Sequence, residues 1–434
     1  MNAALRSFEA QWLTRPADSF SPVRKEAMQR FLRLGLPSLR DETWRYTDLR
    51  SIAAQSFVDA PQQTRGAIEP NASLSLLGKT DLAASLLMVN GHPVMPASDG
   101  LINGIEINSI RDISRFDPNI LLRYLNPLSD ADEQRWVLLN TALFVDGLYL
   151  KVTARMATPL VILHVAAGEG VNNVAYPRVI IEVAPGCSAT IIEHHVAQGK
   201  NTPLNNSNTQ IALSRDAQIE HYRVYATDAA ATHIDSLRID QDRGSSCKQF
   251  TIALGGGLVR TSLEVHLNQA GASLDSYSLL VGHQERHVDC VNIVSHEAPD
   301  TRSSQTARAI ASDSSRVIFN SKVIVKAGAA HSQSQQSCRG LLLSPTAEID
   351  TRPQLEIHTD EVKCAHGATT GRLDPDMLFY MLSRGLDRET AQSLLVYAFL
   401  ADVLTGMSVT SARASIESAL IAQLPDSQIL RKFR

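Results

Sequence analysis

The feature that most constrains this chain is a long series of short β-type runs between about residues 150 and 370. The runs are rich in Val, Ile, Leu and Thr, as in PLVILHV, RVIIEV and KVIV, and Gly, Asp, Ser and Pro separate them. No helical pattern lies between them, which excludes a doubly wound α/β sheet. More than about ten strands in succession are typical of a sandwich, a propeller or a β-helix. Their spacing is too irregular to decide among these three folds.

A small or turn-forming residue stands just before many of these runs. The set is Gly186, Asp216, Gly271, Asp313, Gly328 and Thr346. Gly, Asp and Thr are residues that turns favour, because they tolerate or stabilise tight backbone conformations. The pattern therefore predicts a repeated unit of turn and strand through the centre of the chain.

The two ends of the chain carry helical patterns instead. Residues 1–150 are mixed but mainly helical, with a helix that starts near Pro22 and ends at Gly35. A hairpin is expected at residues 86–94, turning at Asn90-Gly91. We therefore expect an N-terminal, mainly helical domain over 1–150 and a β core over 151–370.

The last segment, residues 371–434, returns to helix. Asp374-Pro375 and Asp387 are helix-start signals, and the two helices that they open are expected to stop at Gly385 and near Gly406. A third helix is predicted over 410–423. The middle helix is apolar on much of its circumference, so it is expected to be packed on two sides, by its neighbours or by another protein.

Composition limits the functional classes. The chain has 434 residues, a net charge of −4 and 5% aromatic residues, and its basic residues are scattered, so no nucleic-acid partner is expected. No apolar stretch reaches the ~20 residues of a membrane span, and no secretory signal is recognised at the start. The five cysteines are odd in number and widely spaced, which indicates free thiols in a reducing cytoplasm.

Familiar enzyme signatures are missing from the sequence. There is no G-x-x-x-x-G-K-[ST], so we expect no ATP binding through a phosphate loop, and Gly255-Gly256-Gly257 is better explained by a turn or bulge. H-E-x-x-H, G-x-S-x-G and C-x-x-C are absent as well. The expectation is a protein without catalytic activity.

Two groups of ligand-type residues favour a structural interpretation. Glu193-His194-His195 lies within a predicted strand, where adjacent side chains point to opposite faces and cannot all meet one metal. His283, His287 and Cys290 resemble zinc ligands, but a fourth ligand is not visible. We expect core or surface histidines at the first group and a structural role for the second.

Cys364 and His366 form a third group. In an extended segment the two side chains point to the same side, about 6.5–7 Å apart along the strand. A thiolate and an imidazole suit iron or zinc, but two ligands are too few for a stable site. From spacing alone, the interpretation of Cys364 as one more buried thiol is favoured.

A resemblance to a known family changes this interpretation of Cys364 and His366. The C-terminal string PQLEIHTDEVKCAHGATTGRLDPDMLFYMLSRGLDRETAQSLLVYAF closely resembles the SufB/SufD family of the SUF iron–sulfur cluster assembly system. GLPSLRDETWRYTDL, beginning at Gly35, and SSRVIFNSKVIV also look like the family. In the latter string the family usually has Gly where this chain has Ser321, a departure that we expect to affect a turn. The matches run from about residue 35 to 400.

Gly367, directly after the histidine, looks like the SufD branch, because the SufB branch typically has an acidic residue there. The resemblance implies a mainly β fold with helical ends: a right-handed parallel β-helix between N-terminal and C-terminal helical domains. It therefore selects one of the three folds that strand spacing left open, with coils that share one core.

The resemblance also implies partners and a site. The β-helix would pair with SufB, and the C-terminal helices would dock the ATPase SufC. Cys364 and His366 match family positions proposed to hold a transient iron–sulfur cluster shared with SufB, and no cofactor is expected to stay on the isolated chain. Six residues are expected to bind partners: Phe379, Tyr380, Arg384, Leu394, Tyr397 and Phe399.

Two alternative functions remain open from the sequence. A SufB-like subunit would hold most of the cluster itself, but Gly367 and the lack of closely spaced cysteines argue against it. A β-helix enzyme acting on polysaccharides would need a row of acidic residues with aromatic subsites, which the sequence lacks. Whether the isolated chain forms a homodimer, and whether it binds flavin, is left open by the sequence.

Overall fold

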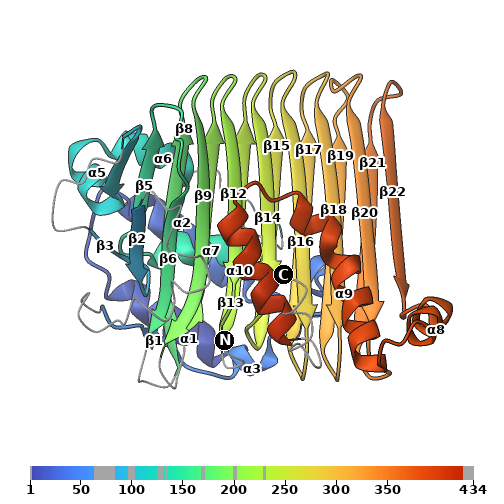
Figure 1. The fold of residues 1–434 in the computed structure, drawn as a ribbon. Helices are drawn as coiled ribbons and strands as arrows, with labels where there is room; N and C mark the ends of the chain where they lie inside the picture. Colours follow the sequence, from blue (N-terminus) through green and yellow to red (C-terminus); the bar gives the residue numbers. More distant parts are fainter. Residues whose placement is uncertain are drawn as a thin grey trace.

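The computed structural model describes residues 2–62, 84–95, 103–125, 131, 134–167, 172–198, 203–227 and 231–423. Its centre is a β-solenoid in which successive strands alternate between two parallel sheets (Figure 1). One sheet contains β5 (Leu148–Val152), β8 (Arg178–Val183), β11 (Asn208–Leu213), β13 (Thr232–Gln241), β15 (Leu258–Leu267), β17 (His287–His296), β19 (Arg316–Val325) and β21 (Glu348–Ile357). The other contains β6 (Leu160–Ala167), β9 (Ser188–Gln198), β12 (Gln218–Tyr225), β14 (Ser246–Ala253), β16 (Ser273–Gly282), β18 (Arg302–Ala311), β20 (Gln333–Leu342) and β22 (Lys363–Gly371). The predicted β-helix, flanked by helical ends, is confirmed.

The coils stack because aliphatic side chains repeat in register on the inner face of each sheet. In the first sheet Ile181, Ile211, Ile239 and Val265 follow one another on neighbouring strands, and each is buried. Burying one such side chain stabilises the fold by roughly 1.5–3 kcal/mol. Each coil thus contributes to a core that only its neighbours complete, as in other solenoids.

The predicted turn residues lie where the chain passes between the sheets. Asp216 and Asp313 have φ of 57° and 55°, and Gly186 has φ of 69°. Asp tolerates this left-handed conformation better than most residues. The amide of Asp216 donates to the carbonyl of Arg243 in the next coil. Ser321, in contrast, lies inside β19 and donates to Gln305, so the expectation that its departure from the family pattern affects a turn is wrong.

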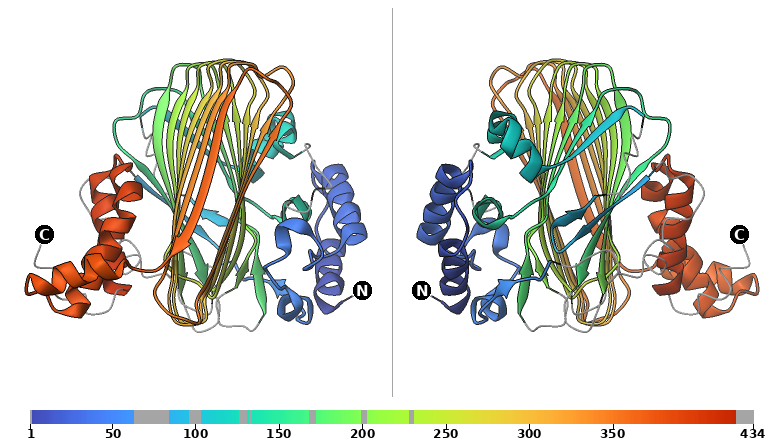
Figure 2. Two further views of the ribbon diagram at one scale, coloured as in Figure 1. Left: turned by 90° about the vertical axis from the view of Figure 1, so that its right-hand side faces the viewer. Right: turned by 90° about the vertical axis from the view of Figure 1, so that its left-hand side faces the viewer.

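The N-terminal helices cover the outer face of the first sheet. They are α1 (Ala3–Leu13), α2 (Ser21–Leu34), α3 (Arg50–Ala53), α5 (Ile110–Phe116), α6 (Pro118–Leu125) and α7 (Arg135–Leu143), with a short 3-10 helix, η1 (Glu42–Trp44). Their apolar side chains share one buried cluster with residues of that sheet, such as Ile180 and Ile234. Figure 2 shows these helices on one side of the solenoid and the C-terminal helices on the other.

The remaining strands lie at the first end of the solenoid or beside it. They are β1 (Val58–Asp59), β2 (Ala84–Val89), β3 (His92–Val94), β4 (Ile105–Ser109), β7 (Asn173–Ala175) and β10 (Leu204–Asn205). The predicted hairpin is confirmed: β2 pairs with β3 in antiparallel fashion, and Asn90 and Gly91 have φ of 51° and 84°. Strand β4 pairs antiparallel with β5, so both sheets end here on an antiparallel strand.

The C-terminal helices begin and end where the sequence predicts. Asp374 caps α8 (Pro375–Ser383), Asp387 caps α9 (Arg388–Thr405), and α10 (Thr410–Gln423) follows. Residues 424–434 of the predicted domain lie outside the described residues. Val396, Leu400 and Val403 of α9 share a buried cluster with the outer face of the second sheet. Among the described residues, no helix has the length and apolarity that crossing a bilayer requires.

Candidate functional site

Cys364 and His366 lie on β22, the last strand of the second sheet. They pair with Ser334 and Gln336 of β20, whose side chains are buried inside the solenoid. The two predicted residues therefore share the inward-facing side of the strand, as an extended segment requires. Cys364 is half-buried against the core, and burial raises the pKa of its thiol. His366 is exposed, because no further coil of the described chain covers it.

His366 ends a row of polar side chains that runs through the interior. Its members occupy one register position on six successive strands of the second sheet: His221, Gln249, Ser276, Gln305, Gln336 and His366. All but His366 are buried. Five strand spacings of about 4.8 Å give the row a length of about 24 Å. Polar side chains thus occupy every register position between the exposed His366 and the buried His221.

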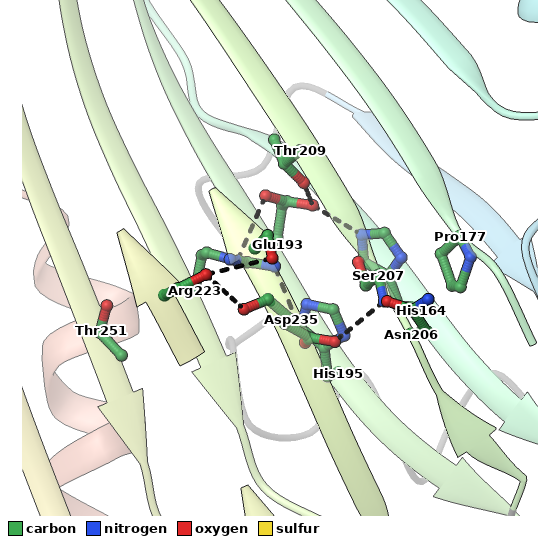
Figure 3. Close-up of polar contacts among 12 residues, drawn as sticks. His164, Pro177, Glu193, His195, Asn206, Ser207, Thr209, Arg223, Asp235 and Thr251 are labelled. Carbon is green, nitrogen blue, oxygen red and sulfur yellow. Dashed lines mark hydrogen bonds and ion pairs between the residues drawn. The ribbon is translucent and has the colours of Figure 1, made fainter. Parts of the chain in front are cut away.

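At the buried end of this row, Glu193 of β9 collects hydrogen bonds (Figure 3). Its carboxylate accepts from His164 at 3.0 Å, from His221 at 3.0 Å and from Thr209 at 2.9 Å. Arg223 lies 3.7 Å away. Burial alone would raise the pKa of Glu193, but the donors and the positive charge outweigh it and hold the pKa well below its usual value. Glu193 is therefore a buried, ionised and fully hydrogen-bonded carboxylate.

A second carboxylate, Asp235 of β13, faces the same interior. One of its oxygens accepts from the amide of Ser207 at 3.1 Å. The other lies 3.7 Å from Arg223 and 3.9 Å from Nδ1 of His195. Burial raises the pKa of Asp235 to about 6 and lowers the pKa of His233 to about 3. Burial also lowers the pKa of His195, so His195 and His233 are neutral imidazoles that lie beside two carboxyl groups and one guanidinium.

The sequence interpretation of Glu193-His194-His195 was correct in one respect and incomplete in another. His194 lies on the outer face, in register with Leu163 and Val224, so the three side chains do not converge. Glu193 and His195, however, share the inner face and meet residues from other coils. The missed partners include His164, Thr209, His221, Arg223, Tyr225, His233 and Asp235.

The second sequence group does not converge. His287 faces the N-terminal region, where its Nε2 lies 2.9 Å from the hydroxyl of Thr47. Cys290 belongs to a buried cluster inside the solenoid, and burial raises its thiol pKa to about 11. His283 precedes the strand, in the turn before β17. Separate positions for these residues agree with the structural role that was expected.

The six residues expected to bind partners fall into two sets. Phe379 and Tyr380 of α8 are 71% and 58% exposed, and the guanidinium of Arg384 lies 5.0 Å from the centre of the Tyr380 ring. Leu394, Tyr397 and Phe399 of α9 are half-buried. Tyr397 and Phe399 pack against the second sheet of the solenoid. The accessible apolar surface is therefore on α8.

Comparison with known proteins agrees with this architecture. A model described as "SUF system FeS cluster assembly, SufBD core domain" matches residues 164–399, and the SufBD protein N-terminal region matches residues 9–162. The chain is 29% identical to the iron-sulfur cluster assembly protein SufD of Escherichia coli, over 96% of this chain and 95% of that protein. It is 26% identical to an iron-sulfur cluster assembly SufBD family protein of Synechocystis, over 89% and 87%. It is 23% identical to SufD of Bacillus subtilis, over 67% of each chain. The chain therefore belongs to the SufBD family of the SUF system of FeS cluster assembly and is SufD-like.

Proposed function

We propose that this chain is a non-catalytic scaffold subunit of a SufB–SufC–SufD complex that assembles iron–sulfur clusters in the cytoplasm. It pairs with SufB through the last coil of its solenoid and docks the ATPase SufC through its C-terminal helices. A nascent cluster is shared with SufB and leaves the complex, so it is cargo. The SufD relative from Escherichia coli, matched over 96% of this chain, supports this role.

The observation that carries the proposal is the open last coil. Strands β21 and β22 are the terminal strands of their sheets, and most residues of β22 are exposed. An unpaired strand edge readily pairs with another chain, and a second solenoid with a similar edge could add its strands there. Cys364 and His366 lie on this coil and supply two ligands. A cluster usually takes four protein ligands, so a partner that supplied the rest would complete the site.

The exposed side of α8 supports a separate contact with the ATPase. Met377, Phe379 and Tyr380 are all more than half exposed, although large apolar side chains favour burial. Arg384, beside Tyr380, adds a cation to this surface. Aromatic residues and Arg are the types that most often dominate binding energy in interfaces. ATP hydrolysis would be left to SufC, because this sequence has no phosphate-binding loop.

The proposal is tested by co-expressing the chain with SufB and SufC and measuring the iron, sulfide and subunit ratio of the purified complex. His366→Ala should leave the complex assembled but with less iron and sulfide. His358→Ala, which changes another exposed histidine at the same end, should leave the cluster unchanged. A double change, Phe379→Ala with Tyr380→Ala, should release SufC while SufB stays bound.

Each part of the proposal can fail separately. A normal cluster load in the His366→Ala complex would remove the ligand role, and loss of the complex itself would make His366 structural. Cys364→Ser should lower the cluster load if the thiolate is a ligand, and should have little effect if it is a buried thiol. Retention of SufC by the α8 double variant would move the ATPase contact to another surface.

A further inference from the structure

The buried network around Glu193 and Asp235 is independent of the open last coil, about 24 Å away along the polar row. Two sets of residues in it bring ligand-type atoms within 4.8 Å of one another: His164, Glu193 and His195, and His195, His233 and Asp235. Every residue in both sets is buried. Ring geometry and hydrogen bonding distinguish the two sets as metal ligands.

The first set is poorly arranged for a metal. The rings of His164 and His195 are stacked, with centroids 4.4 Å apart and planes inclined by only 6°. Ring-nitrogen lone pairs lie in the plane of each ring, so stacked rings direct them along parallel planes and not toward one point. Glu193 is also occupied by three hydrogen bonds. Binding a cation there would require breaking the network that keeps Glu193 ionised.

The second set is better arranged. The rings of His195 and His233 are nearly perpendicular, at 80°, with centroids 5.8 Å apart. One oxygen of Asp235 lies 3.9 Å from Nδ1 of His195. Ligand atoms about 2.1 Å from a tetrahedral metal lie about 3.4 Å from one another. Small side-chain movements toward a common centre would therefore be enough.

Two further observations indicate a missing ligand. Nδ1 of His233 has no hydrogen-bond partner among the described residues, although the His233 side chain is 0% exposed. Buried polar atoms are seldom left without a partner. In addition, two buried carboxylates face a single guanidinium, that of Arg223. An added cation would balance the second negative charge.

We propose that His195, His233 and Asp235 form a buried binding site for one divalent transition ion of the Fe²⁺ or Zn²⁺ class. Two imidazoles and one carboxylate are a ligand set that both ions accept, with a fourth position left open. Glu193 and Arg223 lie beside the site and are not ligands. The ligands come from β9 and β13, which lie on different sheets, so the ion is taken up as the coil folds. This departs from the expectation that the isolated chain retains no metal.

The test uses the full chain, expressed without partners in a defined medium supplied with Co²⁺ or Zn²⁺. Cys364→Ser and His366→Ala are introduced first, so that these two residues of the last coil cannot contribute bound metal. Metal content is measured by elemental mass spectrometry, and the visible absorption of Co²⁺ reports its geometry. We expect about one ion per chain, with the intense bands of four-coordinate Co²⁺.

Asp235→Asn and His233→Gln, in the same background, should each lower bound Co²⁺ by more than about tenfold, since even outer-shell partners of a metal are worth 10–100-fold. His221→Gln is the matched control, because it changes a buried histidine that contacts Glu193 but is not in the proposed set. It should retain the ion. Circular dichroism identifies any variant that fails to fold. If one ligand variant does not fold, the bound Co²⁺ of the other ligand variant tests the proposal.

Three results would overturn the proposal. The first is a folded parent protein that contains no Co²⁺ or Zn²⁺, which would make the network a purely hydrogen-bonded structural element. The second is an unchanged metal content in both ligand variants. The third is loss of metal in His221→Gln with retention in Asp235→Asn, which would assign the ion to the set around Glu193. None of these results depends on whether the chain binds SufB or SufC.

Discussion

The two ends of the polar row place the same residue type in opposite environments. His221 and His366 occupy equivalent inner positions of the second sheet, five strands apart. His221 is fully buried and hydrogen-bonded to Glu193, whereas His366 is exposed on the last coil. His221 has a coil stacked on each side, whereas no coil of the described chain covers the outer side of His366. In a solenoid, therefore, the role of an inner residue depends on what stacks over it as much as on its own type.

The largest expected contrast between the two environments is in thiol reactivity. Cys247 and Cys364 occupy a second shared inner position, one inside the solenoid and one on the last coil. Burial raises the pKa of both thiols, but Cys247 is 1% exposed and Cys364 is half-buried. We expect iodoacetamide to label Cys364 at least about a thousandfold faster, which corresponds to an opening free energy of about 4 kcal/mol for the inner coils. Peptide mass spectrometry over time measures both rates. Similar rates would mean that the inner coils open as readily as the last one.

A second contrast concerns carboxylates. Glu193→Ala should destabilise the chain by about 3–5 kcal/mol, because it leaves Arg223 and the histidines buried without their acceptor. Glu356→Ala is the comparison at the open end, where Glu356 pairs with Lys322 at 2.6 Å in solvent. Its removal should leave the unfolding midpoint in urea unchanged within error. Equal shifts of the midpoint for the two variants would show that burial of the first network does not matter to stability.

The smallest expected effect is that of His366 on stability. His366→Ala should change the free energy of unfolding by no more than about 0.5 kcal/mol, as for most exposed positions. His221→Ala, at the equivalent buried position, should cost about 1–3 kcal/mol because Glu193 loses a donor. Thermal and urea unfolding of the two variants, measured side by side, test the contrast. A large loss for His366→Ala would mean that the last coil is already packed in the isolated chain.

The sequence predicted those structural features that depend only on residues close to one another in the chain. Asp374, Asp387 and the Asn90-Gly91 turn act within a few residues of themselves, and the structure has each of them as expected. Alternation along a strand also placed Cys364 and His366 on one side. These features are local, so a single segment contains the information that specifies them.

The buried network could not be predicted in the same way. Glu193 meets His164 and Arg223 only because three coils are in register, and the sequence does not state the register. Successive members of the polar row are 27 to 31 residues apart. That spacing is the signal that could have revealed them, but turns of unequal length between the strands obscure it. Without the coil boundaries, Glu193-His194-His195 is an ordinary strand segment.

The attachment of α9 to the side of the solenoid has a consequence for how this fold can evolve. The helix packs over strands of the interior, including β16 and β18, while the chain reaches it directly from β22 through α8. One additional coil inserted between β18 and β22 would move the last strand away by about 4.8 Å, and α8 with its flanking turns would have to span the extra distance. The number of coils therefore sets the distance between the strands that α9 covers and the last coil. Surface loops tolerate insertions, but a change in coil number should require a matching change in the connection to α9.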